Sequence, residues 1–143
     1  MNVNAILKSK GTKVVTARPE ATVAALSERL RAEGIGALVV SEDGKTIAGI
    51  VSERDIVRGL AEHGAAVLDR KVGDIMHRDV VTSTGDEDIE AVMGKMTRHR
   101  IRHLPVVENG KLCGIISIGD VVKHRLDELE SETQAMRHYI AGH

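Results

Sequence analysis

The sequence carries one motif twice. Residues 49–57 read GIVSERDIV, and residues 114–122, 65 positions further on, read GIISIGDVV. Two upstream segments repeat in the same order at an offset of 66: IGALVV at 35–40 with IRHLPV at 101–106, and VVT at 14–16 with VVT at 80–82. The offset changes by one residue between Val40 and Gly49, where a loop tolerates an insertion. Two copies of one unit, each of roughly 60 residues, therefore make up most of the chain.

Each copy has the same predicted order of elements. In the first, Thr22 is a suitable N-cap for a helix with apolar residues at helical spacing, and Gly34 ends it. Extended segments at 37–41 and 46–51 flank a polar turn and predict a hairpin, and a second helix follows over about 53–63. The second copy matches, with a helix near 88–96, a hairpin over 104–116 and a helix from about 118. The unit is strand, helix, strand, strand, helix, and the fold class is α+β.

Two units of this size should pack face to face around one aliphatic core, because one alone buries too little surface. We assign residues 1–64 to repeat 1, 65–128 to repeat 2 and 129–143 to a C-terminal helical extension. The extension continues an amphipathic pattern that begins near residue 125, with these residues at three- and four-residue steps: Leu126, Leu129, Thr133, Met136 and Ile140. This stripe covers either the module itself or a second subunit, and the sequence leaves both open.

Composition limits the possible functions. The chain has no Phe or Trp and one Tyr, Tyr139, which argues against modules that stack bases on aromatic rings. The 20 Lys and Arg are balanced by 21 Asp and Glu, so no basic excess favours general nucleic-acid binding. Cys113 is the only cysteine, the N-terminal residues lack the apolar region of a signal peptide, and no apolar run is long enough to cross a membrane. We expect a reduced, cytoplasmic protein with no membrane segment.

A duplicated unit of this order resembles the CBS domain family, in which two tandem repeats form a Bateman module. The resemblance rests on the pattern G-h-h-S-x-x-D-h-V, with h hydrophobic, at the end of each hairpin, and on HLPV at 103–106. It covers about residues 3–128 and implies two repeats related by a pseudo-two-fold axis, with adenosine-containing ligands in the clefts between them. AMP is the first ligand expected; ATP, NAD(H) and S-adenosylmethionine are the others, and none is an obligatory cofactor. The resemblance also implies a homodimer.

The two Ser-x-x-Asp motifs are the main candidate ligand residues. Ser52 and Asp55, and likewise Ser117 and Asp120, stand where a strand turns into a helix, the place of a capping box. The start of a helix also offers free backbone N–H groups to phosphate, and a carboxylate accepts hydrogen bonds from ribose hydroxyls. With the family resemblance, we expect Asp55 and Asp120 to bind ribose, and Ser52 and Ser117 to bind phosphate or ribose. Capping and ligand binding are compatible.

The two half-sites are expected to differ. Repeat 1 has Arg54 inside its motif, where repeat 2 has Gly119. Repeat 2 has Arg102 and His103 shortly before Pro105, where repeat 1 has only Gly and Ala. In the family, residues before this strand often reach the phosphate, so the resemblance makes Arg102, His103 and Pro105 site residues.

The adenine contacts follow from the resemblance and from the composition. Thr16 and Thr82 match positions where family members hold the adenine edge. Since aromatic rings are missing, the adenine must lie between aliphatic side chains, with these as candidates: Ile35, Val51, Ile101 and Ile116.

Other constellations have simpler explanations. The basic segment 95–103 has three possible explanations, of which the sequence favours a solvated helix end first, a clamp for a ligand phosphate second and a polyanion-binding surface last. His99 and His103 have the spacing of a helical zinc pair, but Pro105 indicates that the helix has ended, and no further ligands join them or His138 and His143. A buried thiol explains Cys113. No metal site and no catalytic residues are expected, because the chain lacks recognisable nucleophile, phosphate-loop and dinucleotide motifs.

The leading hypothesis is a stand-alone, non-enzymatic sensor that binds an adenine nucleotide between its repeats and signals to a downstream protein through changed conformation or dimer packing. The first alternative is an interaction adaptor that acts through its C-terminal helix without a ligand. The second alternative is a DNA-binding regulator that uses residues 95–103.

Overall fold

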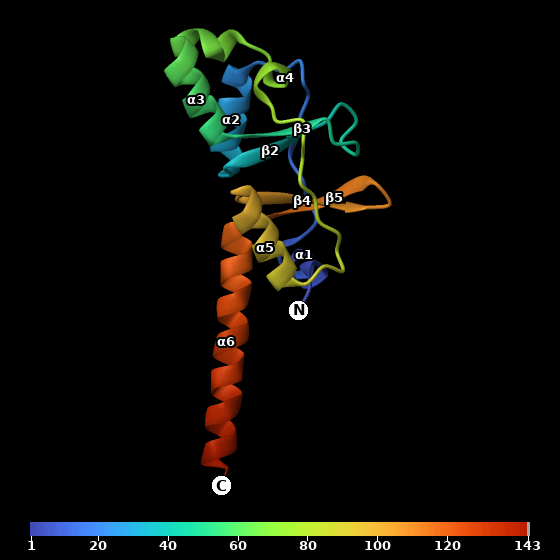
Figure 1. Cartoon of the computed structure of the whole chain (residues 1–143), viewed down its shortest axis with the longest axis vertical. Helices are drawn as coiled ribbons and strands as arrows, with labels where there is room; N and C mark the ends of the chain where they lie inside the picture. Colours follow the sequence, from blue (N-terminus) through green and yellow to red (C-terminus); the bar gives the residue numbers. More distant parts are fainter. Residues whose placement is uncertain (143) are drawn as a thin grey trace.

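The computed structural model describes residues 1–142, and its elements follow the duplicated order predicted from the sequence (Figure 1). The first repeat consists of β1 (Thr16–Ala17), α2 (Val23–Glu33), β2 (Ala37–Val40), β3 (Gly49–Ser52) and α3 (Glu53–His63). The second consists of α5 (Ile89–His99), β4 (His103–Glu108), β5 (Lys111–Ser117) and α6 (Ile118–Ala141). The connecting elements are α1 (Val3–Lys10), the 3₁₀ helix η1 (Gly64–Asp69) and α4 (Val72–Ile75). The α+β class is confirmed.

The sheets show the duplication and one departure from it. In the first repeat, β1 pairs in parallel with β2, and β2 pairs antiparallel with β3. In the second, β4 and β5 form the antiparallel hairpin, with a register shift between Val106 and Val107. The first strand predicted for the second copy, at 80–82, is reduced to a single parallel bridge between Ser83 and Val106. Ser83 N donates to Pro105 O, and Val107 N donates to Ser83 O, so the backbone still follows the path of β1.

The short helices α1 and α4 are exchanged between the repeats. The α1 residues Val3, Ile6 and Leu7 are buried in the core of the second repeat, with Val92, Leu104 and Ile116 among their neighbours. In the same way, Val72 of α4 is buried in the core of the first repeat. The described apolar residues therefore form two clusters instead of the one core that we expected, because each repeat completes its core with a helix from outside its own strand–helix–strand–strand–helix unit.

The two exchanges use the same backbone hydrogen bonds. Val3 N donates to Glu87 O at 3.0 Å, and Val72 N donates to Ala21 O at 2.8 Å. One residue further along, Asn4 N binds Gly85 O and Gly73 N binds Pro19 O. The acceptors in each pair are 66 residues apart, which is the offset of the sequence repeat. The pseudo-two-fold relation therefore extends to the helices that join the repeats.

The first residue of each GIVS or GIIS segment is glycine because the exchanged helix approaches the hairpin there. A Cβ on Gly49 would lie 2.6 Å from Met76 Sδ and 2.7 Å from His77 O. A Cβ on Gly114 would lie 2.8 Å from Leu7 Cδ2. All three distances are shorter than Cβ contacts normally are, so a side chain at either position would force a neighbouring atom to move.

The last helix extends away from the rest of the molecule (Figure 1). Its first turns pack against α5, β5 and α1, with Val121 buried, whereas residues 129–142 are exposed. Within the described part of the chain, no helix combines the length and the apolar character needed to span a membrane.

We expect Gly49→Ala to destabilise the fold more than Gly114→Ala. At Gly49 the new methyl group meets the carbonyl oxygen of His77, which cannot move without breaking backbone pairing, whereas at Gly114 it meets the flexible end of Leu7. Overpacking of this kind costs about 1 to 3 kcal/mol of unfolding free energy. Urea denaturation measures the effect, and Gly94→Ala on α5, which has room for a methyl group, is the control. Equal losses for the two variants would contradict this explanation.

Candidate functional site

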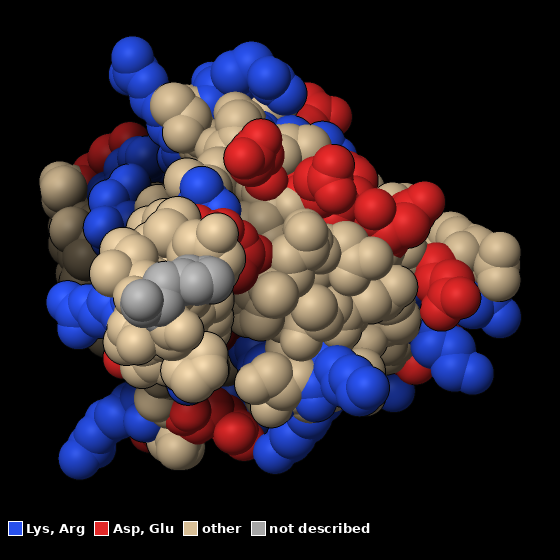
Figure 2. All heavy atoms as spheres, turned by 90° about the horizontal axis from the view of Figure 1, so that it is seen from below, with Lys and Arg blue, Asp and Glu red and all other residues tan. Residues whose placement is uncertain are grey.

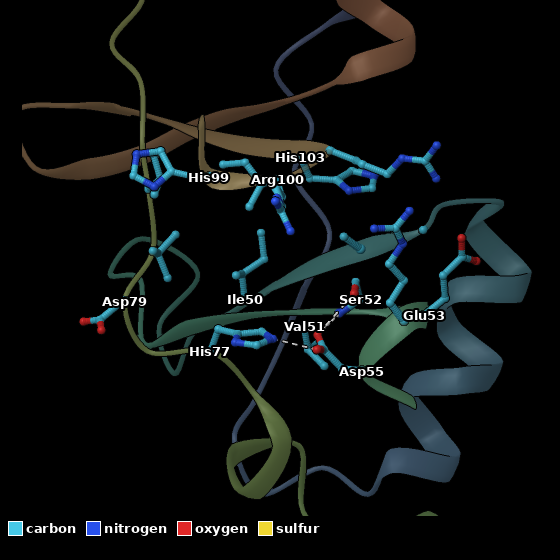
Figure 3. Close-up of a pocket in the computed structure, with 17 residues that line it drawn as sticks. Ile50, Val51, Ser52, Glu53, Asp55, His77, Asp79, His99, Arg100 and His103 are labelled. Carbon is cyan, nitrogen blue, oxygen red and sulfur yellow. Dashed lines mark hydrogen bonds and ion pairs between the residues drawn. The ribbon is translucent and has the colours of Figure 1, made fainter. Parts of the chain in front are cut away.

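A cleft of about 380 Å³ lies between the repeats (Figure 3). One wall comes from the first repeat, at the junction of β3 with α3, and the opposite wall comes from the end of α5 and the start of β4. The segment after α4 closes one side. The lining residues are 36–37, 50–55, 77, 79–81 and 99–103.

Asp55 is the buried carboxylate of this cleft, with 7% of its surface exposed. Its Oδ2 accepts hydrogen bonds from Ser52 N at 2.8 Å and from Ser52 Oγ at 3.1 Å, which fixes the start of α3. Its Oδ1 lies 2.6 Å from His77 Nε2 (Figure 3). The same oxygen lies 3.5 Å from Arg58 Nη1. Because a carboxylate has about four acceptor positions and Asp55 already has four partners, a ligand hydroxyl reaches Oδ1 by displacing His77 or Arg58.

Asp120 holds the equivalent position in the second repeat, but its partner is a lysine. Lys10 Nζ at the end of α1 donates to Asp120 Oδ2 at 2.6 Å and to Ile115 O at 2.9 Å. Ser117 N also donates to Asp120 Oδ2. Burial raises the pKa of Asp120, but the bonds from Lys10 and Ser117 outweigh it, so the pKa lies below the usual 3.8. Lys10 thus covers this carboxylate from the side of the exchanged helix.

His103 and Glu53 both lie beside Gly36. A Cβ on Gly36 would lie 3.4 Å from Glu53 Oε1 and 3.5 Å from His103 Cε1, so the missing side chain keeps this part of the cleft open. Burial and the charge of Lys10 lower the pKa of His103, against an opposite effect of Glu53. At neutral pH, His103 is therefore a neutral imidazole that can accept or donate one hydrogen bond.

Arg100 enters the cleft from a backbone conformation that is unusual for its residue type. It ends α5 with φ of 53°, in the left-handed region, where the first repeat has Gly34 with φ of 65°. A residue with a Cβ pays about 1 to 2 kcal/mol in this region, and such positions concentrate at functional sites. The arginine puts a guanidinium on the cleft wall at the position where glycine would serve the fold better.

The cleft brings together half of the predicted ligand residues. Ser52, Arg54, Asp55, Arg102 and His103 line it, the first three from one repeat and the last two from the other. Of the predicted adenine neighbours, Val51 and Ile101 also line it. Ile35 and Ile116 instead pack in the first and second apolar clusters.

The other predicted ligand residues lie outside this cleft. Ser117 and Asp120 are at the start of α6, Pro105 is buried within β4, and the carbonyl oxygen of Thr82 accepts from Lys95 Nζ at 2.9 Å. Thr16 borders a separate hollow with Arg18, Arg29 and Ser41. Neither hollow includes Asp120.

Sequence reasoning did not assign His77, Glu53 or Asp79 to the site, and it treated Arg100 only as part of a basic segment. The sequence does contain a signal for His77. The segment before it, Val72-x-x-Ile75-Met76, has the same apolar spacing as Val3-x-x-Ile6-Leu7, the segment before Lys10. The two basic residues that follow these segments are the partners of Asp55 and Asp120.

The basic segment 95–103 does not form one continuous cationic surface. Lys95 is engaged by Glu87 Oε1 at 2.5 Å and by the Thr82 carbonyl, whereas residues 99–103 turn into the cleft. Seen along α6 in Figure 2, Lys and Arg lie beside Asp and Glu around the face, and neither sign of charge covers it.

Among residues 1–142 no group of three or more His, Cys, Asp or Glu could hold a metal ion, and His143 lies outside the described residues.

The fold and the site together define the class of protein. It is a tandem-repeat module in which two copies of one unit exchange helices and form a cleft between them. The CBS domain family model matches residues 9–62 and 72–127, and the chain belongs to the CBS domain family. The CBS-domain containing protein ATU1752 from Agrobacterium tumefaciens has 44% identity and a TM-score of 0.85, with 87% of this chain and 99% of that chain covered.

Two further proteins are similar to this chain. The mitochondrial CBS domain-containing protein CBSX3 of Arabidopsis thaliana is 34% identical over 98% of this chain and 72% of its own length. The CBS domain pair of protein MJ0100 has 25% identity and a TM-score of 0.79, with 90% of this chain and 98% of that chain covered. The MJ0100 pair was solved in complex with 5′-methylthioadenosine and S-adenosyl-L-methionine.

We expect Lys10→Met to destabilise the protein more at neutral pH than in acid, where only the bond from Lys10 to Ile115 O is lost. The folded-state pKa of Asp120 lies below its unfolded value, so the pairing stabilises the fold above about pH 3.8, and this contribution is lost as the pH falls through the folded-state pKa. The exposure of the pair limits the loss to about 1 kcal/mol. Urea denaturation at a series of pH values from 7 downwards measures it. Lys13→Met, at a looser pair with Glu33, is the control, and a pH-independent loss for Lys10→Met would contradict the assignment.

Proposed function

We propose that this protein is a regulatory sensor that binds an adenosine-containing ligand in the cleft between its repeats, with AMP as the first candidate and ATP, NAD(H) and S-adenosylmethionine as the others. The observation that carries the proposal is a buried carboxylate, Asp55, opposite cationic side chains of the other repeat in one cleft. The volume of about 380 Å³ is within the range of small-molecule sites. The complex of the MJ0100 CBS pair with adenosine derivatives supports the ligand class.

In this proposal each part of the ligand has a partner of suitable chemistry. The ribose hydroxyls donate to Asp55, whose charge makes these bonds stronger than neutral ones. The phosphate lies toward Arg100, Arg102 and His103, and Arg54 lies on the same side as Asp55. The adenine ring packs against aliphatic side chains such as Val81 and Ile101, without stacking on an aromatic ring.

Ligand binding can be signalled through His77. Its ring binds Asp55 Oδ1, while its backbone N and O pair with Ile50 at 2.9 Å each. A ribose hydroxyl on Oδ1 competes with the imidazole, and the segment that carries His77 directly follows α4, the helix that the second repeat contributes to the first core. Ligand binding in the cleft can therefore change how the segment after α4 is held between the repeats. The size of this change depends on how differently the ligand binds the arrangement with His77 on Asp55 and the arrangement with His77 displaced.

We place this sensor in the cytoplasm as a non-catalytic homodimer that acts on a downstream protein. A single thiol, Cys113, suits a reducing compartment. The groups that line the cleft, a carboxylate opposite basic side chains, are suited to holding a nucleotide in place.

Isothermal titration calorimetry with AMP, ATP, NADH, S-adenosylmethionine and adenosine tests the proposal. We expect AMP binding, and Asp55→Asn should weaken it by about 10-fold to 100-fold, because a charge-assisted hydrogen bond is worth about 1.5 to 3 kcal/mol. Asp120→Asn, at the position covered by Lys10, should have a smaller effect, and Asp127→Asn on exposed α6 should have none. Thermal unfolding checks that each variant is folded. Absence of binding for every ligand up to millimolar concentration would overturn the proposal.

Arg100→Gly should separate stability from binding. We expect the free energy of unfolding to rise by up to about 1 kcal/mol, since glycine adopts the left-handed conformation without a Cβ penalty, as Gly34 does in the first repeat. The same change removes a guanidinium from the cleft, so AMP affinity should fall about 10-fold while adenosine affinity stays constant.

Denaturation and calorimetry on one sample measure both effects. Arg98→Ala, on α5 but outside the cleft, is the control for a general loss of positive charge. Unchanged AMP affinity for Arg100→Gly would exclude this arginine from the phosphate site.

A further inference from the structure

The outer part of α6 carries an exposed apolar stripe. Leu126, Leu129, Met136 and Ile140 have exposed fractions of 60%, 43%, 60% and 66%, and Val122 at the start of the stripe has 49%. The helix leaves the body of the molecule after its first turns, so the described part of the protein does not cover these side chains (Figure 1). The exposed part of α6, residues 129–142, has about the length at which an isolated helix is marginal in water. Apolar packing is what normally stabilises such a helix.

The stripe has the spacing of a coiled-coil seam. Its steps alternate strictly between four and three residues: Val122, Leu126, Leu129, Thr133, Met136 and Ile140. With Leu126, Thr133 and Ile140 at heptad position a, positions d are Val122, Leu129 and Met136. Thr133 is the one polar member, and its hydroxyl donates to Leu129 O at 2.9 Å within its own helix. The seam covers 19 residues, or about 27 Å at 1.5 Å per residue.

The charges beside the seam determine which partner fits and in which direction. Positions g include Arg125 and Glu132, and positions e include Glu130 and Arg137. In a parallel pair of identical helices, each g residue faces the e residue five positions later on the partner. Arg125 then faces Glu130 of the second copy, and Glu132 faces Arg137. Both contacts are attractive, and symmetry repeats each of them on the other side of the seam.

An antiparallel pair of the same helices is disfavoured by charge. Keeping the apolar residues matched puts Leu126 opposite Met136 and Leu129 opposite Thr133. Position e then faces position e of the other helix, so Lys123 meets Arg137 and Glu130 meets its own counterpart. These contacts join like charges. The same sequence that supports a parallel homodimer therefore opposes the antiparallel one.

We propose that the outer part of α6 forms a parallel two-stranded coiled coil with α6 of a second copy of this chain. Arg125 already binds Glu128 Oε2 of its own helix at 2.8 Å, and the five N–H donors of its guanidinium allow a second carboxylate to bind. The parallel direction puts the two CBS modules at the same end of the coiled coil, next to each other. This inference concerns the helix alone and does not depend on ligand binding in the cleft.

Disulfide trapping tests the direction of the helices in the full-length protein. In a Cys113→Ala background, Met136→Cys at position d should form an intermolecular disulfide under mild oxidation, because d residues of parallel helices face each other. Gln134→Cys, at an outer position on the same turn, is the matched control and should stay monomeric on non-reducing gels. Equal cross-linking at both positions, or none at Met136→Cys, would overturn the proposal. So would a disulfide formed only between a Leu126→Cys chain and a Met136→Cys chain, since that pairing is antiparallel.

Charge variants give an independent test by sedimentation equilibrium and by the yield of the Met136→Cys disulfide. Glu132→Arg alone and Arg137→Glu alone each put like charges together in the parallel pair, and each should raise the dimer dissociation constant about 3-fold to 10-fold or lower the disulfide yield. The double variant, Glu132→Arg with Arg137→Glu, restores opposite charges and should recover wild-type behaviour. Stronger pairing by Arg137→Glu, which would then face Lys123, would identify the antiparallel arrangement and contradict the proposal.

Discussion

The reciprocal exchange of two short helices is the constraint on which the rest of the structure depends. Helix α1 precedes the first repeat but completes the core of the second, and α4 precedes the second repeat but completes the core of the first. Neither repeat can bury its apolar face without the other, as expected for units of this small size. The exchange also fixes the inter-repeat cleft, because the backbone that leaves α4 forms one side of it.

The same exchange makes the two halves of the module similar in backbone and different in chemistry. Each Ser-x-x-Asp motif starts a helix, and each aspartate receives a basic side chain from the end of an exchanged helix or from the residues just after it. At Asp55 this side chain is a half-exposed histidine, which a ligand can displace, and at Asp120 it is a lysine that binds the carboxylate and a backbone carbonyl. The different residues explain why we locate the ligand at the first aspartate, although the motifs are nearly identical.

Much of the fold could be predicted from the sequence, because the duplicated motif contains the turn, the cap and the apolar period of its elements. Thr22 and Gly34 delimit α2 as expected, with Thr22 Oγ1 accepting from Ala25 N. The prediction of a single core was wrong, because α1 and α4 lie outside the segments that repeat at 65 or 66 residues. Val3 and Val72 are 69 residues apart, so a search at the main offset does not align them.

The candidate site was predictable only where it is local in sequence. Ser52, Arg54 and Asp55 belong to one motif, and Arg102 and His103 to another, so pattern reasoning found them. His77 reaches Asp55 from 22 residues away, after the exchanged helix, and Glu53 and His103 both lie beside Gly36 although they come from different repeats. Such contacts depend on how the repeats pack, and the sequence signals them only through the similar apolar spacing before His77 and before Lys10. The prediction that Asp120 binds ribose as Asp55 does took no account of Lys10, which contacts Asp120 from the exchanged helix.

The most direct test of the account is a crystal structure of the protein grown with AMP. We expect the nucleotide in the cleft between β3 and the end of α5, with its ribose hydroxyls within hydrogen-bonding distance of the Asp55 carboxylate and its phosphate beside Arg100 and Arg102. A nucleotide bound at Asp120 with the Asp55 cleft empty, or one bound elsewhere on the molecule, would contradict the account.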